Sequence, residues 1–187
     1  MTVIEFRRIA QRLRVPLGFA LAPAFLVFAR PSFSSLVSGA AIAILGLAVR
    51  AWASGHLRKM AELTTSGPYA YTRNPLYLGT FLIVVGASLA GGVWWLACAA
   101  AAAYLIVYVP VMLAEIDTMR ALFPGAYDEY SAAVPLFVPQ FTPARTPGAA
   151  ADSRFDSRLY LKYREYRAPL GLIAFLAVLA VKMVVTK

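Results

Sequence analysis

Apolar residues along this chain fall into long blocks, at residues 15–29, 35–54, 76–114 and 168–185. The third block runs for 39 residues without a charged side chain. A bilayer core about 30 Å thick is crossed by roughly 20 apolar helical residues, so this block is too long for one crossing. Gly91 and Gly92 mark a turn near its middle. The pattern therefore predicts five transmembrane helices, at residues 15–29, 35–54, 76–90, 93–114 and 168–185, with the third and fourth forming an antiparallel hairpin.

Composition supports a membrane protein. The 187 residues are 60% hydrophobic and 14% charged, and the mean hydropathy is +0.67. Soluble domains have about 45–50% apolar and about 25% charged residues, so this chain has too little charge to cover a water-facing surface. We predict an all-α integral membrane protein with a single domain over residues 1–187. One cysteine and one histidine exclude an intrachain disulfide and a zinc site built from Cys and His.

The excess of basic residues also agrees with a membrane topology. The chain has 18 Lys and Arg against 9 Asp and Glu. If the five spans alternate, fourteen of these 18 cations fall on one side of the membrane. The positive-inside rule then predicts a cytoplasmic N-terminus and cytoplasmic loops, with the C-terminus on the opposite side. Because topology accounts for the charge, a nucleic-acid-binding function is disfavoured.

Polar chemistry is concentrated in two of these loops, residues 55–77 and 115–140, which we predict to be catalytic. The first contains a rigid aromatic run, Gly67-Pro68-Tyr69 followed by Arg73-Asn74-Pro75-Leu76-Tyr77, in which two prolines restrict the backbone. The second opens with Glu115, the first acid after a long apolar span. An acid at a membrane edge is a candidate functional group. An ion pair with Arg73 or Arg120 is the structural alternative.

Together the two loops resemble a known family. The run SGPYAYTRNPLYLG and the later run AEIDTMRALFPGAYDEYSAAVPLFVP are similar to motifs of the integral membrane methyltransferases. That group includes the isoprenylcysteine carboxyl methyltransferases and the phospholipid N-methyltransferases. The resemblance implies a cofactor, S-adenosylmethionine, bound on the cytoplasmic side, and a lipophilic acceptor that enters from the bilayer.

The resemblance also implies roles for individual residues. Glu115 and Arg73 are the catalytic candidates, and Glu115 is also a cofactor contact. Tyr127 and Tyr130 match tyrosines of the second motif and are expected to be structural. The remaining implied cofactor contacts are His56, Ala61, Glu62, Leu63, Thr64, Tyr69, Asn74, Pro75, Leu76 and Tyr77.

Three positions depart from the family pattern. Asn74 replaces the usual histidine of the Arg-His-Pro run, and Ile116 replaces the second acid of a Glu-Glu pair. Val111 stands where the carboxyl methyltransferases have an arginine that binds the substrate carboxylate, so a prenylcysteine carboxylate is a doubtful substrate. Two alternatives stay open: an NADPH-dependent membrane reductase of a sterol-like lipid, and a non-catalytic membrane scaffold.

Overall fold

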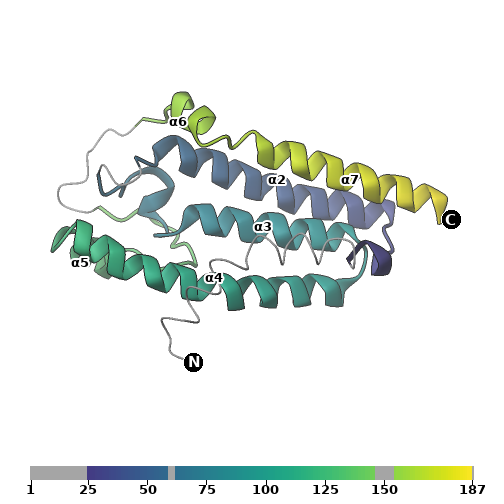
Figure 1. The fold of residues 1–187 in the computed structure, drawn as a ribbon, viewed down its shortest axis with the longest axis horizontal. Coiled ribbons are helices and arrows are strands. Elements are labelled where there is room, and N and C mark those ends of the chain that lie inside the picture. Colours follow the sequence, from purple (N-terminus) through teal and green to yellow (C-terminus); the bar gives the residue numbers. More distant parts are fainter. Residues whose placement is uncertain (1–24, 59–61, 146–153, 187) are drawn as a thin grey trace.

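The computed structural model describes residues 25–58, 62–145 and 154–186, and this part of the chain is helical without strands. Four long helices pack side by side: α2 (Phe33–His56), α3 (Pro75–Ala90), α4 (Trp94–Leu122) and α7 (Arg167–Val185) (Figure 1). Three short helices gather at one end of this bundle: η1 (Gly67–Ala70), α5 (Ala126–Ala133) and α6 (Ser157–Lys162). The structure confirms the predicted all-α membrane class.

Three of the helices are long and apolar enough to cross a bilayer, namely α2, α4 and α7. The α3 helix is apolar but has 16 residues. At 1.5 Å per residue it is about 24 Å long, a little less than the bilayer core. The predicted hairpin of α3 and α4 is present, but α4 continues past the predicted end at residue 114 to Leu122.

The first predicted span, residues 15–29, lies almost entirely outside the described residues, so the count of five stays a prediction. The side of the membrane on which each terminus lies also stays a prediction of the charge distribution. Within the described part, the two loops predicted to be catalytic lie at the same end of the bundle, as alternating spans require (Figure 1).

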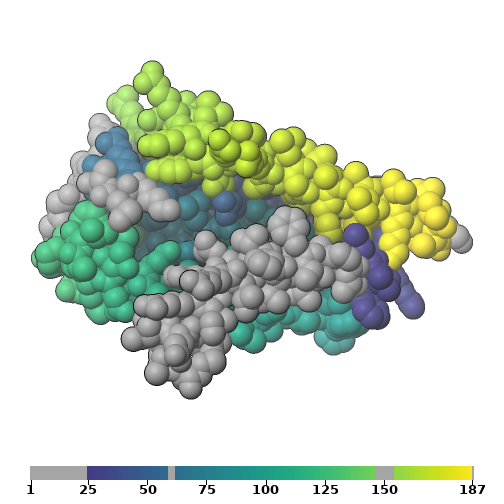
Figure 2. Space-filling view, viewed as in Figure 1, coloured from purple at the N-terminus to yellow at the C-terminus, as the bar shows by residue number. Residues whose placement is uncertain are grey.

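The outer faces of the long helices are apolar, as a bilayer environment requires. Helix α7 lies along the outside of the bundle (Figure 2), with Ile173 64% and Val184 70% exposed. On α2, Phe33 is 75% exposed. Side chains of this kind are stable when lipid covers them, since lipid tails offer the same environment as a protein core.

Glycines allow α2 and α3 to approach each other backbone to backbone. A Cβ atom added to Gly86 would lie 2.5 Å from the Ala43 nitrogen and 2.6 Å from the Gly39 oxygen, closer than any side chain tolerates. Gly46 and Gly79 form a second contact of this kind. Small residues at such contacts are the usual means by which membrane helices associate.

The predicted turn at Gly91-Gly92 is confirmed. Gly92 has a φ of 76°, a conformation that favours glycine, and an added Cβ would collide with the Arg30 carbonyl. The Arg30 amide donates a hydrogen bond to the Gly91 carbonyl over 2.7 Å. The turn therefore also holds the segment that precedes α2.

Two glycine-to-alanine substitutions should change stability in opposite directions. Gly86→Ala should lower the free energy of unfolding by about 1–3 kcal/mol, because the new methyl group collides with the α2 backbone. Gly171→Ala, in the second turn of α7, meets no described atom within 4 Å and should raise it by about 0.5–1 kcal/mol through helix propensity. Thermal unfolding in detergent micelles measures both shifts. Equal melting temperatures for the two variants would contradict the proposed α2–α3 contact.

Candidate functional site

The first loop enters α3 through two proline-initiated turns. Pro68 is the second residue of the short helix η1, and Pro75 is the first residue of α3, where its missing N–H costs nothing. Gly67 begins η1 with a φ of 59°, which a glycine adopts without strain. The backbone conformation of the stretch between the two turns is therefore restricted by its own sequence.

The first loop pairs with the segment that follows α5, so the two predicted motifs form one unit. The Arg73 amide donates to the Pro135 carbonyl over 2.9 Å, and the Asn74 side-chain amide donates to the Leu136 carbonyl over 3.0 Å. Asn74 thus joins the two loops, a role that its position in the first motif alone did not reveal. Further hydrogen bonds run from Thr72 Oγ1 to Phe137 O, from Gln140 N to Tyr71 O and from Ala144 N to Ala70 O.

Two tyrosines of α5 complete this unit. The Tyr130 hydroxyl donates to the Tyr69 carbonyl over 2.7 Å. Burial raises the pKa of the Tyr69 and Tyr130 hydroxyls, so both phenols are neutral at physiological pH. Tyr127 accepts a hydrogen bond from Arg73 Nη1 over 3.3 Å, and the guanidinium lies 6.0 Å from the centre of its ring.

A cavity of about 610 Å³ lies between the paired loops and the C-terminal half of α4. This is a typical size for a small-molecule site. Its wall is made of Arg50, Leu57, Glu62, Leu63, Thr64, Tyr69, Arg73, Asn74, Pro75, Leu76, Tyr77, Thr80, Tyr108, Met112, Glu115, Thr118, Met119, Phe123, Tyr127 and Tyr130.

Arg73 is the notable cation of this wall. Its Nε atom is buried and has no hydrogen-bond partner among the described residues. No acid of that part of the chain forms an ion pair with it, so the alternative in which Glu115 pairs with Arg73 is absent there. A buried donor without a partner is unfavourable in an empty protein and favourable once an anion binds there.

Glu115 is the notable anion. The Tyr77 hydroxyl donates to Glu115 Oε1 over 2.7 Å, which orients the carboxylate at the cavity wall. Tyr77 is fixed in turn, because its carbonyl accepts a hydrogen bond from the Tyr104 hydroxyl over 2.8 Å. The ring of Tyr108 lies 5.5 Å from that of Tyr77 and stacks on Tyr104 at 4.2 Å. Arg120, the other partner named in the structural alternative for Glu115, pairs with Asp128.

Most of the residues expected to form the site meet at this cavity. Ten of them line it: Glu62, Leu63, Thr64, Tyr69, Arg73, Asn74, Pro75, Leu76, Tyr77 and Glu115. Their roles toward a cofactor stay predictions. Ala61 lies outside the described residues.

His56 does not line the cavity. Its ring is buried beside Gly67, and its Nδ1 lies 2.9 Å from the Trp52 carbonyl. Sequence reasoning missed Arg50 and Tyr108, which reach the cavity from the apolar spans. The signal for Arg50 was a charge inside a span, which marks a functional candidate by default.

Comparison with known proteins agrees with this geometry. A relative, the nickel-cobalt-cadmium resistance protein NccN of Alcaligenes xylosoxydans xylosoxydans, is 33% identical over 90 residues. The match covers 47% of this chain and 42% of that protein, so this chain spans less than half the length of this relative. No solved structure matches. The phospholipid methyltransferase family matches residues 33–126, half of the chain, which include α2, α3, α4 and most of the cavity wall. The chain therefore belongs to the phospholipid methyltransferase family of membrane proteins.

Proposed function

We propose that this chain binds S-adenosylmethionine in the 610 Å³ cavity and transfers its methyl group to a lipophilic acceptor. The observation that carries the proposal is the presence of two complementary charges in one wall. Arg73 has a buried nitrogen without a partner in the described chain, and Glu115 is a carboxylate held in place by Tyr77. The cofactor carries one carboxylate and two cationic groups, so its binding requires both signs of charge.

The amino-acid end of the cofactor fits the polar part of the wall. Arg73 would bind the carboxylate, since a guanidinium offers paired donors of matching geometry. Glu115 and Glu62 would stabilise the ammonium and sulfonium groups. The faces of Tyr77 and Tyr108 would add to this, because aromatic rings attract cations.

The adenosine end fits the apolar part. Leu63, Met112, Met119 and Phe123 line the same cavity and offer apolar and polarizable surface to a flat ring. Small-molecule sites are commonly built this way, with an apolar lining and a few polar groups that set orientation.

The chemistry of methyl transfer suits these residues. When bound, S-adenosylmethionine supplies an electrophilic methyl group on a sulfonium. The residues of the chain then need only to align the two reactants and exclude water, because an in-line displacement depends on geometry more than on proton relay. The position of His56, the sole histidine, outside the cavity wall agrees with this.

The acceptor is proposed to enter from the bilayer, with the cofactor loops on the cytoplasmic side. Val111 is buried, at 1% exposure, and supplies no charge near the cavity. A prenylcysteine carboxylate therefore has no partner at this position. The NADPH-dependent reductase fits less well, since the phosphates of that cofactor require several free cations. The wall provides Arg73, and Arg50 is already paired with Glu165.

Substitution of the Glu115–Tyr77 pair should weaken cofactor binding. In detergent-solubilised protein, isothermal titration with S-adenosylmethionine should show about tenfold weaker binding for Tyr77→Phe, which removes one hydrogen bond to a charged group. Glu115→Gln should weaken binding by about 10- to 100-fold, because it removes the charge itself. Asp117→Asn is the matched control, since it removes the same charge from the same helix outside the cavity wall.

The same titration with NADPH separates the alternatives. NADPH should not bind at the concentrations at which S-adenosylmethionine saturates the protein. Binding of NADPH alone would replace the proposal with the reductase, and binding of neither cofactor would favour the scaffold.

The role of Arg73 is testable by changing protein and ligand together. Decarboxylated S-adenosylmethionine should bind the wild-type protein at least about tenfold more weakly than the intact cofactor, because Arg73 loses its anion. In Arg73→Gln the two ligands should bind with nearly equal affinity, since the interacting pair is already lost. In each protein, the ratio of the two dissociation constants gives the preference for the intact cofactor, and the difference between the two proteins measures the contact of Arg73 with the carboxylate. The same ratio in both proteins would place the carboxylate away from Arg73.

A further inference from the structure

A second cavity, of about 390 Å³, lies between α3 and α7. Apart from Arg50 and Thr80, its wall is made of apolar and small residues: Ile83, Ala87, Ala168, Gly171, Leu172 and Phe175. Arg50 and Thr80 line both cavities. The second cavity therefore adjoins the proposed methyl-transfer site at these two side chains.

Gly171 lines the second cavity without packing against a neighbouring helix. The glycines of α2 and α3 at positions 39, 46, 79 and 86 all lie against the backbone of the facing helix. Gly171 is also in a long helix, yet an added Cβ would meet nothing within 4 Å. A glycine in a helix normally lowers stability relative to alanine. Here Gly171 is exposed, and among the described residues no atom fills the space beside it.

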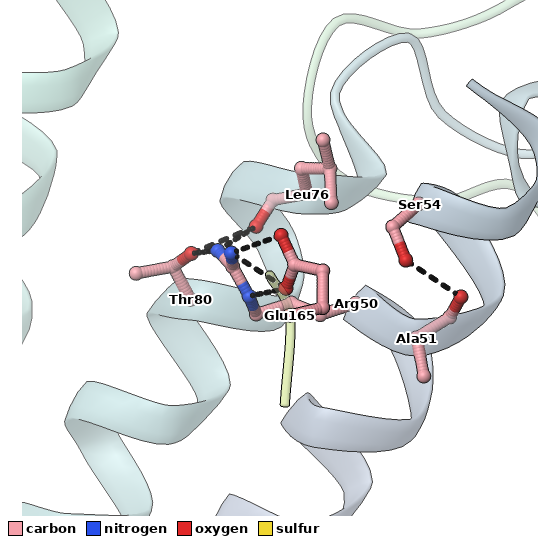
Figure 3. A network of polar contacts seen from close by, with 6 residues as sticks. All are labelled: Arg50, Ala51, Ser54, Leu76, Thr80 and Glu165. Atoms are coloured by element: carbon pink, nitrogen blue, oxygen red, sulfur yellow. Dashed lines mark hydrogen bonds and ion pairs between the residues drawn. The ribbon is translucent and has the colours of Figure 1, made fainter. Parts of the chain in front are cut away.

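The boundary between the two cavities is an ion pair (Figure 3). Arg50 Nε donates to Glu165 Oε2 over 3.0 Å, and Nη2 lies 2.9 Å and 2.8 Å from the two carboxylate oxygens. Nη1 donates to the Thr80 hydroxyl and, over 3.5 Å, to the Leu76 carbonyl. The side chains of Arg50 and Glu165 are 23% and 10% exposed. The charge of Arg50 is thus compensated, and each guanidinium nitrogen has a partner.

The backbone before Glu165 is shaped to make this contact. Arg164 has a φ of 55°, the one positive value of a residue other than glycine in the described chain. A side chain with a Cβ rarely adopts this conformation, which is retained where the surrounding structure requires it. The turn at Arg164 directs Glu165 back toward α2 at the point where α7 begins.

We propose that the second cavity binds the apolar chain of the methyl acceptor, and that the Arg50–Glu165 pair selects an uncharged head group. This inference rests on the proposed methyl transfer. The acceptor is a single-chain lipid with a hydroxyl or thiol head, which passes beside Arg50 and Thr80 to reach the first cavity. In the reaction the oxygen or sulfur of the head forms a bond to the methyl carbon as the bond from methyl to sulfonium breaks. The methylated head then loses its proton to bulk water as the product leaves the cavity.

Volume and charge both support this class of acceptor. At about 30 Å³ for a methylene-sized group, 390 Å³ corresponds to roughly a dozen carbons, the size of one alkyl chain. A carboxylate or phosphate head would have to compete with Glu165 for Arg50. An uncharged head leaves the pair intact.

Photolabelling tests whether the apolar chain of the acceptor binds in the second cavity. The probe is a 12-carbon alcohol with a diazirine at the far end of its chain, added to full-length protein in lipid nanodiscs. Mass spectrometry should place the label on residues 80–87 of α3 and residues 168–175 of α7. Dodecanethiol should compete with the probe at least about tenfold more effectively than dodecanoate, since only dodecanoate opposes the ion pair.

Gly171 provides a matched pair of variants. Gly171→Phe adds a large side chain to the cavity wall, where an added Cβ meets no described atom, and should weaken labelling at least about tenfold, while Gly171→Ala should leave it nearly unchanged. Both variants should bind S-adenosylmethionine as the wild type does. Undiminished labelling of Gly171→Phe, or labelling that dodecanethiol does not reduce, would overturn the inference and identify a bulk-lipid contact. Normal labelling without any S-adenosylmethionine binding would overturn the proposed function instead.

Two further variants test the head-group selection. Glu165→Gln frees the charge of Arg50 and should improve competition by dodecanoate at least about tenfold relative to dodecanethiol. The double variant Arg50→Gln/Glu165→Gln has neither charge and should not show that gain. A general loss of structure would weaken both competitors alike. An unchanged preference in Glu165→Gln would overturn the role of the ion pair.

Discussion

The close approach of α2 and α3 is the constraint on which the other features depend. Gly46 and Gly79 bring the two backbones together, and the absence of a side chain at Gly79 leaves room for the stem of Arg50. Arg50 can therefore lie across α3 and reach Thr80 and the Leu76 carbonyl. The same packing fixes the start of α3, and with it the loop that leads into it. A helix pair with larger residues at the contact would separate Arg50 from α3.

The two cations of the cavity wall differ in a way that separates their roles. Arg50 is held by the Glu165 carboxylate through its Nε and one terminal nitrogen, and it contributes little net charge. Arg73 has the hydroxyl of Tyr127 as a partner, together with a buried nitrogen that no described residue satisfies. A compensated charge defines a boundary, whereas an uncompensated one favours an anionic ligand. The distribution of acids, more than that of the arginines, therefore determines where an anion can bind.

Much of the fold followed from the sequence because it depends on local pattern. The apolar block of residues 76–90 and the Gly91-Gly92 turn closely match α3 and its end, since chain length and turn residues determine both. The end of α4 at Leu122 was not predicted, because a helix that leaves the bilayer continues through polar residues without a change of period. The predicted site residues met at one cavity because the two motifs pair through their backbones.

Other contacts depend on residues that are far apart in the chain, and no local pattern reveals them. Arg50 and Glu165 are separated by 115 positions. The stretch of chain before Glu165 is attached to the end of α2. The Asp156 amide donates to the Gly55 carbonyl over 2.9 Å, and the Tyr163 hydroxyl donates to the Leu57 carbonyl over 3.2 Å. Helix α7 is thus positioned by the same end of α2 that supports the first loop. It is for this reason a wall of the second cavity and more than a membrane anchor.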